Sequence, residues 1–213
     1  MDFNYIYKYP NEKSIIDRYL FNYLTDYPVD LSYKFGFTPN MLTTVSFSLQ
    51  LLSIKFLLND DLLLYSLFYI LGYYFDCIDG PLARKYNMVT VFGDFYDHIT
   101  DVLCFLMTLF IYIVKLNIFN HTLISFSYIF IFYGLLKYVG CQEIMHNKLI
   151  PDNQKSMTLY FTTKFVRDLE KEKRIFKVFG FTFFILFHTS VPFLINLQIH
   201  INHLVQQYHS MQY

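Results

Sequence analysis

The chain has 213 residues, with 17 acidic and 17 basic side chains and a formal net charge of zero. Its length fits a single domain, and balanced charge gives no global field that would attract nucleic acid. Hydrophobic residues make up 54% of the chain, which favours membrane-embedded segments. Three cysteines in apolar segments, an odd number, predict neither a disulfide framework nor a zinc site.

The chain opens with a charged segment that precedes the first long apolar run. Residues 13–27 place apolar side chains on one helical stripe and charged side chains opposite, which predicts an amphipathic helix. This helix is too short and too charged to cross a bilayer, so we expect it to lie in the membrane interface. We therefore divide the chain into an N-terminal interfacial segment, 1–36, and a transmembrane domain, 37–213.

Long apolar runs follow, and each is expected to form one membrane span. The expected spans cover 41–58, 62–75 with a continuation into a polar motif, 93–114, 122–145 and 175–195. Pro39 suits a helix start, with Thr38 or Asn40 as the cap, and Pro192 should kink or end the last span. The polar stretch 146–174 separates the last two spans. The fold class is therefore all-α, a polytopic membrane helix bundle.

Basic residues are distributed unevenly over the ends of the expected spans, which indicates orientation. If the N-terminus is cytosolic, Arg84, Lys85 and the basic residues of the polar stretch before the last span also lie on the cytosolic side. Only Lys55 and Lys115 fall at the outer ends. We expect the motif after the second span to face the cytosol.

Four aspartates are concentrated between the second and third spans. They are Asp76, Asp79, Asp97 and Asp101. The first two are three residues apart and the last two are four apart, so on two helices each pair shares one face. Asn87 and Gly93 predict a turn that brings these faces together. An ionised carboxylate at membrane depth is costly unless it is paired or binds a metal. Oxygen ligands without clustered thiolates favour Mg²⁺ or Mn²⁺, and a two-ion arrangement would suit phosphoryl transfer.

Small and basic residues complete a spaced pattern around these acids. Written as D-x2-D-G-x2-A-R-x8-G-x3-D-x3-D, it is filled at all eight fixed positions: Asp76, Asp79, Gly80, Ala83, Arg84, Gly93, Asp97 and Asp101. It resembles the signature of the CDP-alcohol phosphotransferase (class-I CDP-alcohol phosphatidyltransferase) family. The resemblance implies a membrane enzyme that moves a phosphoalcohol or phosphatidyl group from a CDP-linked donor to a lipid or alcohol acceptor and releases CMP. Family members often have six spans and form homodimers, so 175–205 would give either one span or two short helices.

The resemblance also implies roles for individual residues. Asp76, Asp79 and Asp97 would be metal ligands, and Asp101 would be the general base while also contacting the second of two Mg²⁺ or Mn²⁺ ions. The expected substrate-binding residues are Gly80, Ala83, Arg84, Gly93 and Asn40. Among these, Arg84 would contact phosphate in preference to merely anchoring its span, whereas Asn40 would either assist the donor or cap its helix.

The identity of the head group is open between two variants. Asp94 and the Asp97-His98 pair resemble the choline/ethanolamine phosphotransferase branch, whose donor is CDP-choline or CDP-ethanolamine and whose acceptor is diacylglycerol. The alternative is a CDP-diacylglycerol donor with a small polyol acceptor. A non-enzymatic or transporter-like membrane protein is a distant alternative, and it would spread its acids through the depth of the bundle.

Three further polar residues each allow two interpretations. His98 is adjacent to Asp97 and should point off the aspartate face, where it would either support the ligand or simply pack. Glu143, near the cytosolic end of the fourth span, could meet a cationic head group. Pairing with Lys137, or exposure at the interface, is the favoured interpretation of Glu143. Lys137 could instead bind an acceptor phosphate.

Overall fold

The computed structural model describes residues 26–148, 160–176 and 180–211. The expected amphipathic helix over 13–27 lies almost entirely outside these ranges. Within them the chain is helical and contains no strand. The elements, in order, are α3 (Asp26–Lys34), α4 (Pro39–Leu58), α5 (Leu62–Lys85), α6 (Val91–Val114), η2 (Ile118–Asn120), α7 (Thr122–Asn147), α8 (Tyr160–Thr163), α9 (Leu169–Phe176) and α10 (Phe181–Met211).

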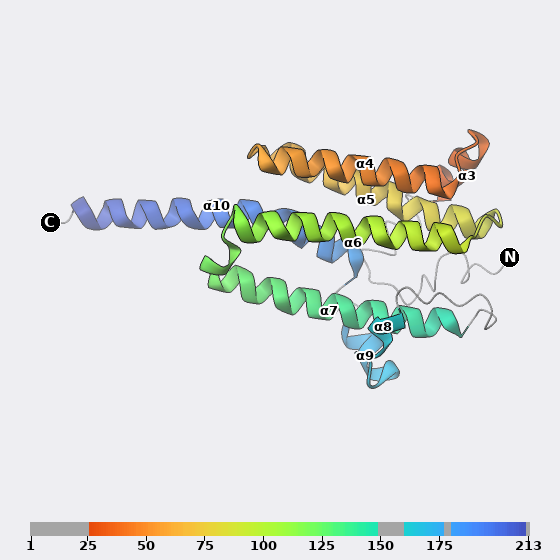
Figure 1. Cartoon of the computed structure of the whole chain (residues 1–213). Helices are drawn as coiled ribbons and strands as arrows, with labels where there is room; N and C mark the ends of the chain where they lie inside the picture. Colours follow the sequence, from red (N-terminus) through yellow and green to blue (C-terminus); the bar gives the residue numbers. More distant parts are fainter. Residues whose placement is uncertain (1–25, 149–159, 177–179, 212–213) are drawn as a thin grey trace.

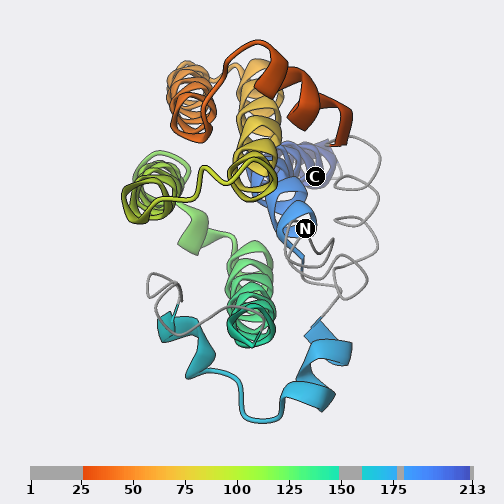
Figure 2. The ribbon, with the colours of Figure 1, turned by 90° about the vertical axis from the view of Figure 1, so that its right-hand side faces the viewer.

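Five of these helices, α4, α5, α6, α7 and α10, are long and apolar enough to cross a membrane. They run alongside one another as a bundle (Figure 1), and Figure 2 shows the same bundle nearly end-on. The prediction of an all-α, multi-pass membrane protein is confirmed.

The last span differs from the expected one at both ends. It begins at Phe181 and not near residue 175, because 169–176 form the separate helix α9, in which five of eight side chains are charged. It then continues through Pro192 to Met211 as one helix. Ending a helix inside a membrane would leave backbone groups without partners, which explains why one proline does not stop it. Residues 181–211 therefore form one span, and the break into two short helices is not seen.

Local sequence signals explain where the helices around the motif start and stop. Thr38, and not Asn40, caps α4 by accepting a hydrogen bond of 3.3 Å from the backbone N–H of Met41. Asn87 adopts a φ of 56°, a left-handed conformation that asparagine tolerates. The N–H of Met88 then donates to the carbonyl of Ala83 at 2.8 Å and closes the end of α5. The predicted turn at Asn87 is thus confirmed, whereas Gly93 does not form part of it and lies in the first turn of α6, which begins at Val91.

The bundle is held together in its middle by packed rings and a few polar contacts. Gly72 of α5 lies so close to α4 that a Cβ there would be 2.7 Å from Cγ of Gln50. The Tyr112 hydroxyl of α6 donates a hydrogen bond of 2.6 Å to the backbone carbonyl of His188 in α10. The Tyr65 hydroxyl of α5 lies 2.7 Å from the Tyr112 hydroxyl. These contacts join α5, α6 and α10, and they therefore hold the motif-bearing helices α5 and α6 in position relative to α10.

Candidate active site

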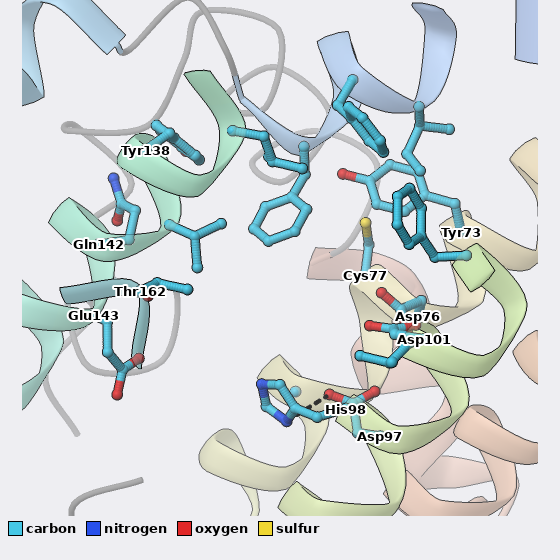
Figure 3. Close-up of a pocket in the computed structure, with 18 of the residues that line it drawn as sticks. Tyr73, Asp76, Cys77, Asp97, His98, Asp101, Tyr138, Gln142, Glu143 and Thr162 are labelled. Carbon is cyan, nitrogen blue, oxygen red and sulfur yellow. Dashed lines mark ion pairs between the residues drawn. The ribbon is translucent and has the colours of Figure 1, made fainter. Parts of the chain in front are cut away.

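A cavity of about 390 Å³ lies where the motif ends of the helices come together. Its walls come mainly from α5, α6, α7 and α10, with Phe161 and Thr162 of α8 closing one side. Most of the wall is apolar, and the polar side chains gather at one part of it. Figure 3 shows aspartates on one wall, and Gln142, Glu143 and Thr162 on the other.

Three of the four motif aspartates meet in this cavity. Asp76 projects from α5, while Asp97 and Asp101 project from successive turns of α6 (Figure 3). One carboxylate oxygen from each residue lies within 4.8 Å of those from the other two. Ligands about 2.0–2.6 Å from a shared Mg²⁺ or Ca²⁺-sized ion would have such separations. The three residues therefore fit a divalent cation by both spacing and ligand type.

Asp79 lines the same cavity but is held differently. Its side chain is buried, with 4% exposed, and Oδ2 accepts a hydrogen bond of 2.6 Å from the hydroxyl of Thr43 in α4. Asp79 is thus beside the three-carboxylate cluster and is not one of its members. Thr43 is a site residue that the sequence interpretation missed. The sequence signal for it is weak: Thr43 is a hydroxyl residue one helical turn after Pro39, but Thr44, Ser46 and Ser48 in the same helix offer hydroxyls as well.

His98 also lines the cavity, contrary to the expectation that it points off the aspartate face. Its Nδ1 lies 2.6 Å from the backbone carbonyl of Asp94. Because a carbonyl only accepts, Nδ1 carries the hydrogen and donates it. The same nitrogen is 3.9 Å from Oδ2 of Asp97, the contact drawn in Figure 3. The Asp94 carbonyl therefore fixes the imidazole beside a motif carboxylate.

Two of the expected substrate-binding residues, Gly80 and Arg84, line the cavity. A Cβ on Gly80 would lie 3.0 Å and 3.1 Å from the two terminal guanidinium nitrogens of Arg84. The guanidinium therefore folds back over Gly80, and the missing side chain makes room for it. This close contact explains why the pattern has a glycine four residues before its arginine.

The other three expected substrate-binding residues lie away from the cavity lining. Ala83 is at the end of α5, where its carbonyl accepts from Met88. Asn40 and Gly93 meet where α4 and α6 begin, since a Cβ on Gly93 would be 2.9 Å from Oδ1 of Asn40. The role of these residues in binding substrate stays a prediction.

Lys137 and Glu143 both lie on α7, but only Glu143 lines the cavity. Lys137 donates to both carboxylate oxygens of Glu172 in α9, at 2.9 Å and 3.0 Å, and it does not line the cavity. Burial raises the pKa of Glu172, but the hydrogen bond and positive charge of Lys137, together with backbone hydrogen bonds from Arg167 and Asp168, leave the pKa below its usual value. Glu143 is 3% exposed and lines the cavity. The expectation that Glu143 lies exposed at the interface is therefore wrong.

Comparison with known proteins identifies the family of this chain. A family model described as CDP-alcohol phosphatidyltransferase matches residues 37–200. The chain belongs to this family. The family is one of transferases in phospholipid biosynthesis, and it implies a CDP-linked alcohol as donor and an alcohol as acceptor. CDP-alcohol phosphatidyltransferases generally use divalent metal ions, in agreement with the aspartate cluster.

Similarity to individual proteins covers less of the chain. A protein of Aquifex aeolicus (strain VF5), described as "Uncharacterized protein", is 40% identical over 68 residues. The match covers 32% of this chain and 35% of the length of the Aquifex protein. No solved structure gives a significant match.

Proposed function

We propose that this protein transfers a phosphoalcohol group from a CDP-linked amino alcohol, of the choline or ethanolamine type, to diacylglycerol with release of CMP. The observation that carries the proposal is the meeting of Asp76, Asp97 and Asp101 within 4.8 Å of one another, in a cavity that Arg84 also lines. Family membership supports the reaction class, and it argues against the transporter-like alternative.

The proposed reaction forms a bond from the acceptor oxygen to the phosphorus next to the transferred alcohol and breaks the bond to the CMP oxygen. Two Mg²⁺ or Mn²⁺ ions, held by Asp76, Asp79, Asp97 and Asp101, would polarise that phosphate and neutralise the charge on departing CMP. Asp101 would accept the proton of the acceptor hydroxyl. Arg84 would hold a phosphate through two parallel N–H donors, and Gly80 keeps the space over which that guanidinium lies.

Two observations favour the amino-alcohol variant over a small phosphorylated polyol. His98 is fixed by the backbone carbonyl of Asp94 and lies beside Asp97, so two of the three residues that resemble the choline/ethanolamine branch, Asp97 and His98, line the cavity. Lys137, which could have bound an acceptor phosphate, is instead bound to Glu172 away from the cavity. Phosphatidyl transfer from CDP-diacylglycerol to a small polyol remains the alternative.

The wider organisation of the protein is part of the same proposal. We place the cavity on the cytosolic side of the membrane, where CDP-linked substrates occur, because Arg84 and Lys85 end α5 there. Residues 37–213 would form the transmembrane catalytic domain and 1–36 an interfacial segment, of which α3 packs on the motif end of α5. A homodimer is the proposed assembly.

A substrate panel tests the proposed reaction. Purified protein with Mg²⁺ is given diacylglycerol with CDP-choline or CDP-ethanolamine, and separately CDP-diacylglycerol with glycerol phosphate or inositol, and CMP is measured. We expect CMP from the amino-alcohol donors. CMP only from the CDP-diacylglycerol reactions would select the alternative, and no CMP from any pair would overturn the proposed function.

A further inference from the structure

One wall of the cavity is formed by a short helix and not by a membrane span. Phe161 and Thr162 of α8 line the cavity, and α8 belongs to the polar stretch between α7 and α10. Thr162 is 1% exposed, and Figure 3 shows it across the cavity from Asp97. The proposed reaction gives α8 no role, although these side chains border the space that faces the metal-binding residues.

The backbone of α8 lies directly on α7 at a glycine. A Cβ on Gly140 would be 2.5 Å from the carbonyl oxygen of Thr162 and 2.8 Å from Cγ2 of Val166. The valine side chain could rotate away, but the carbonyl belongs to the backbone and could move only with α8 itself. Because glycine inside a helix is destabilising relative to alanine, the close approach of α8 explains why a glycine is present here.

A second contact holds the same segment on the same face of α7. Lys137 lies three residues before Gly140, on the same helical face, and donates to both carboxylate oxygens of Glu172 in α9. Val139 and Gln142, which line the cavity, lie on a different face of α7. A substitution at Gly140 would therefore move α8 without altering the α7 side chains that line the cavity.

The position of α8 matters for the proposed reaction because of where the reacting phosphorus must lie. Ions held by the aspartates would bind that phosphate, so an alcohol joined to the phosphorus, or attacking it, extends from the aspartate wall toward the opposite wall. In an apolar pocket, one methylene group more or less changes specificity by about 10- to 200-fold. The distance from α8 to the aspartates therefore limits the bulk of the alcohol.

We propose that α8 is the specificity wall of this site: Thr162, held in place by Gly140, sets the largest alcohol that can face the aspartates. The inference rests on the proposed CMP-releasing reaction and names the residues that select its substrate by size. The alcohol is either the one linked to CDP in the donor or the free acceptor. Thr162 contacts this alcohol, whereas Gly140 is a positioning residue that acts through α8.

A series of alcohols of increasing bulk measures the available room. The series runs from ethanolamine through choline to triethylcholine. Each alcohol is presented either as the CDP-linked donor with diacylglycerol or as the free acceptor with CDP-diacylglycerol, and KM and kcat for CMP release are measured on the full-length protein with Mg²⁺. Gly140→Ala moves α8 outward, and Thr162→Ser removes one methyl group from the wall. Thr163→Ser is the control, because Thr163 is the neighbouring residue and does not line the cavity.

In the wild type we expect alcohols above a limiting size to have a KM about tenfold higher or more. Gly140→Ala and Thr162→Ser should each lower the KM of the first excluded alcohol about tenfold, with kcat for smaller alcohols within about twofold of the wild type. Thr163→Ser should keep the wild-type limit. CMP release without any size limit in the wild type, or with the same limit in Thr162→Ser, would overturn the inference even if Gly140→Ala did not fold. An equal shift in Thr163→Ser would also overturn it.

A second measurement does not depend on the reaction. Cys77 lines the same cavity on the aspartate-bearing helix α5 (Figure 3), and in the described part of the chain its thiol forms no disulfide. Methanethiosulfonates of increasing bulk modify the protein, and mass spectrometry identifies the modified cysteine. We expect Gly140→Ala and Thr162→Ser to accept a bulkier reagent at Cys77 than the wild type and Thr163→Ser accept. Equal limits in all these proteins would overturn the inference.

The two measurements separate the inference from the reaction on which it rests. CMP release with the same size limit in every variant would retain the proposed function and overturn the role of α8. A shifted limit at Cys77 without CMP release from any substrate pair would support the α8 wall and overturn the proposed reaction.

Discussion

The Thr43 hydroxyl donates a hydrogen bond of 2.6 Å to Oδ2 of Asp79, joining α4 to a motif aspartate on α5. Asp79 has little solvent around it, so this bond fixes which of its oxygens points toward the cavity. Asp79 is a proposed metal ligand, and losing a group that orients a metal ligand typically costs about 10- to 100-fold in metal affinity or activity. Thr43 therefore becomes part of the candidate site although no motif position includes it.

Replacing Thr43 tests this relationship. In Thr43→Val the side chain keeps its shape but loses the donor, so we expect the Mg²⁺ concentration needed for half-maximal CMP release to rise about 10- to 100-fold. Thr43→Ser should keep most of the wild-type affinity. Thr44→Val is the matched control, since the Thr44 hydroxyl contacts the Asn40 carbonyl and Tyr96 instead. A Mg²⁺ dependence in Thr43→Val equal to that of the wild type would contradict the assigned role.

The Lys137–Glu172 ion pair gives a prediction about stability. The two side chains are only 6% and 12% exposed, and removing one partner of a buried pair leaves the other charge uncompensated. We expect Lys137→Met to lower the free energy of unfolding in mixed micelles by about 3 kcal/mol, and Lys137→Met/Glu172→Leu to recover most of the loss.

The neighbouring Lys173–Glu170 pair is the control for this measurement. Its glutamate side chain is 73% exposed, so Lys173→Met should change the unfolding free energy by no more than about 0.5 kcal/mol. Equal losses for Lys137→Met and Lys173→Met would show that the Lys137–Glu172 pair has no special structural role.

Asp30 gives a pH-dependent prediction for the docking of α3. Hydrogen bonds from Lys85 and Tyr86, at 2.6 Å and 2.7 Å, hold the pKa of Asp30 below its usual value. The same Asp30 contact raises the pKa of Tyr86 to about 12. Because the folded-state pKa of Asp30 is depressed, its stabilisation is present above the unfolded-state value of about 3.9 and disappears as the pH falls through the lower folded-state value.

We therefore expect Asp30→Asn to weaken α3 docking at neutral pH. The substitution should have little effect at a pH low enough to protonate Asp30. The Asp30 side chain is 43% exposed, so the loss should be only about 0.5 kcal/mol. Hydrogen–deuterium exchange of the α3 amides at pH 7 and pH 3 measures it. Faster exchange in the variant at both pH values, by the same factor, would contradict an electrostatic origin.

Much of this fold follows from local sequence. Apolar runs locate α4 to α7, Thr38 and Pro39 mark a helix start, and Asn87 marks the turn after the motif. The i, i+3 and i, i+4 spacings place acids on shared faces, and Asp76, Asp97 and Asp101 do meet in the structure. These features depend on the periodicity and capping of single helices, which a sequence shows directly.

Other features depend on which helices become neighbours and were not predictable in this way. Thr43 meets Asp79 because Gly72 allows α4 and α5 to approach closely. Lys137 meets Glu172 because a separate amphipathic helix, α9, returns to α7. His98 enters the cavity because the Asp94 carbonyl turns its ring. The continuation of α10 through Pro192 also depends on the membrane around it, because a helix end inside the bilayer would leave backbone N–H and C=O groups without hydrogen-bond partners.

The account as a whole depends on the aspartate cluster serving Mg²⁺-dependent release of CMP. The most direct test is the rate of CMP release by Asp101→Asn in the presence of Mg²⁺ and the preferred CDP-linked donor. Asp60→Asn is the control, because Asp60 pairs with Lys115 at the opposite end of the bundle. We predict a loss of about a thousandfold for Asp101→Asn and wild-type rates for Asp60→Asn. Full activity in Asp101→Asn would contradict the account.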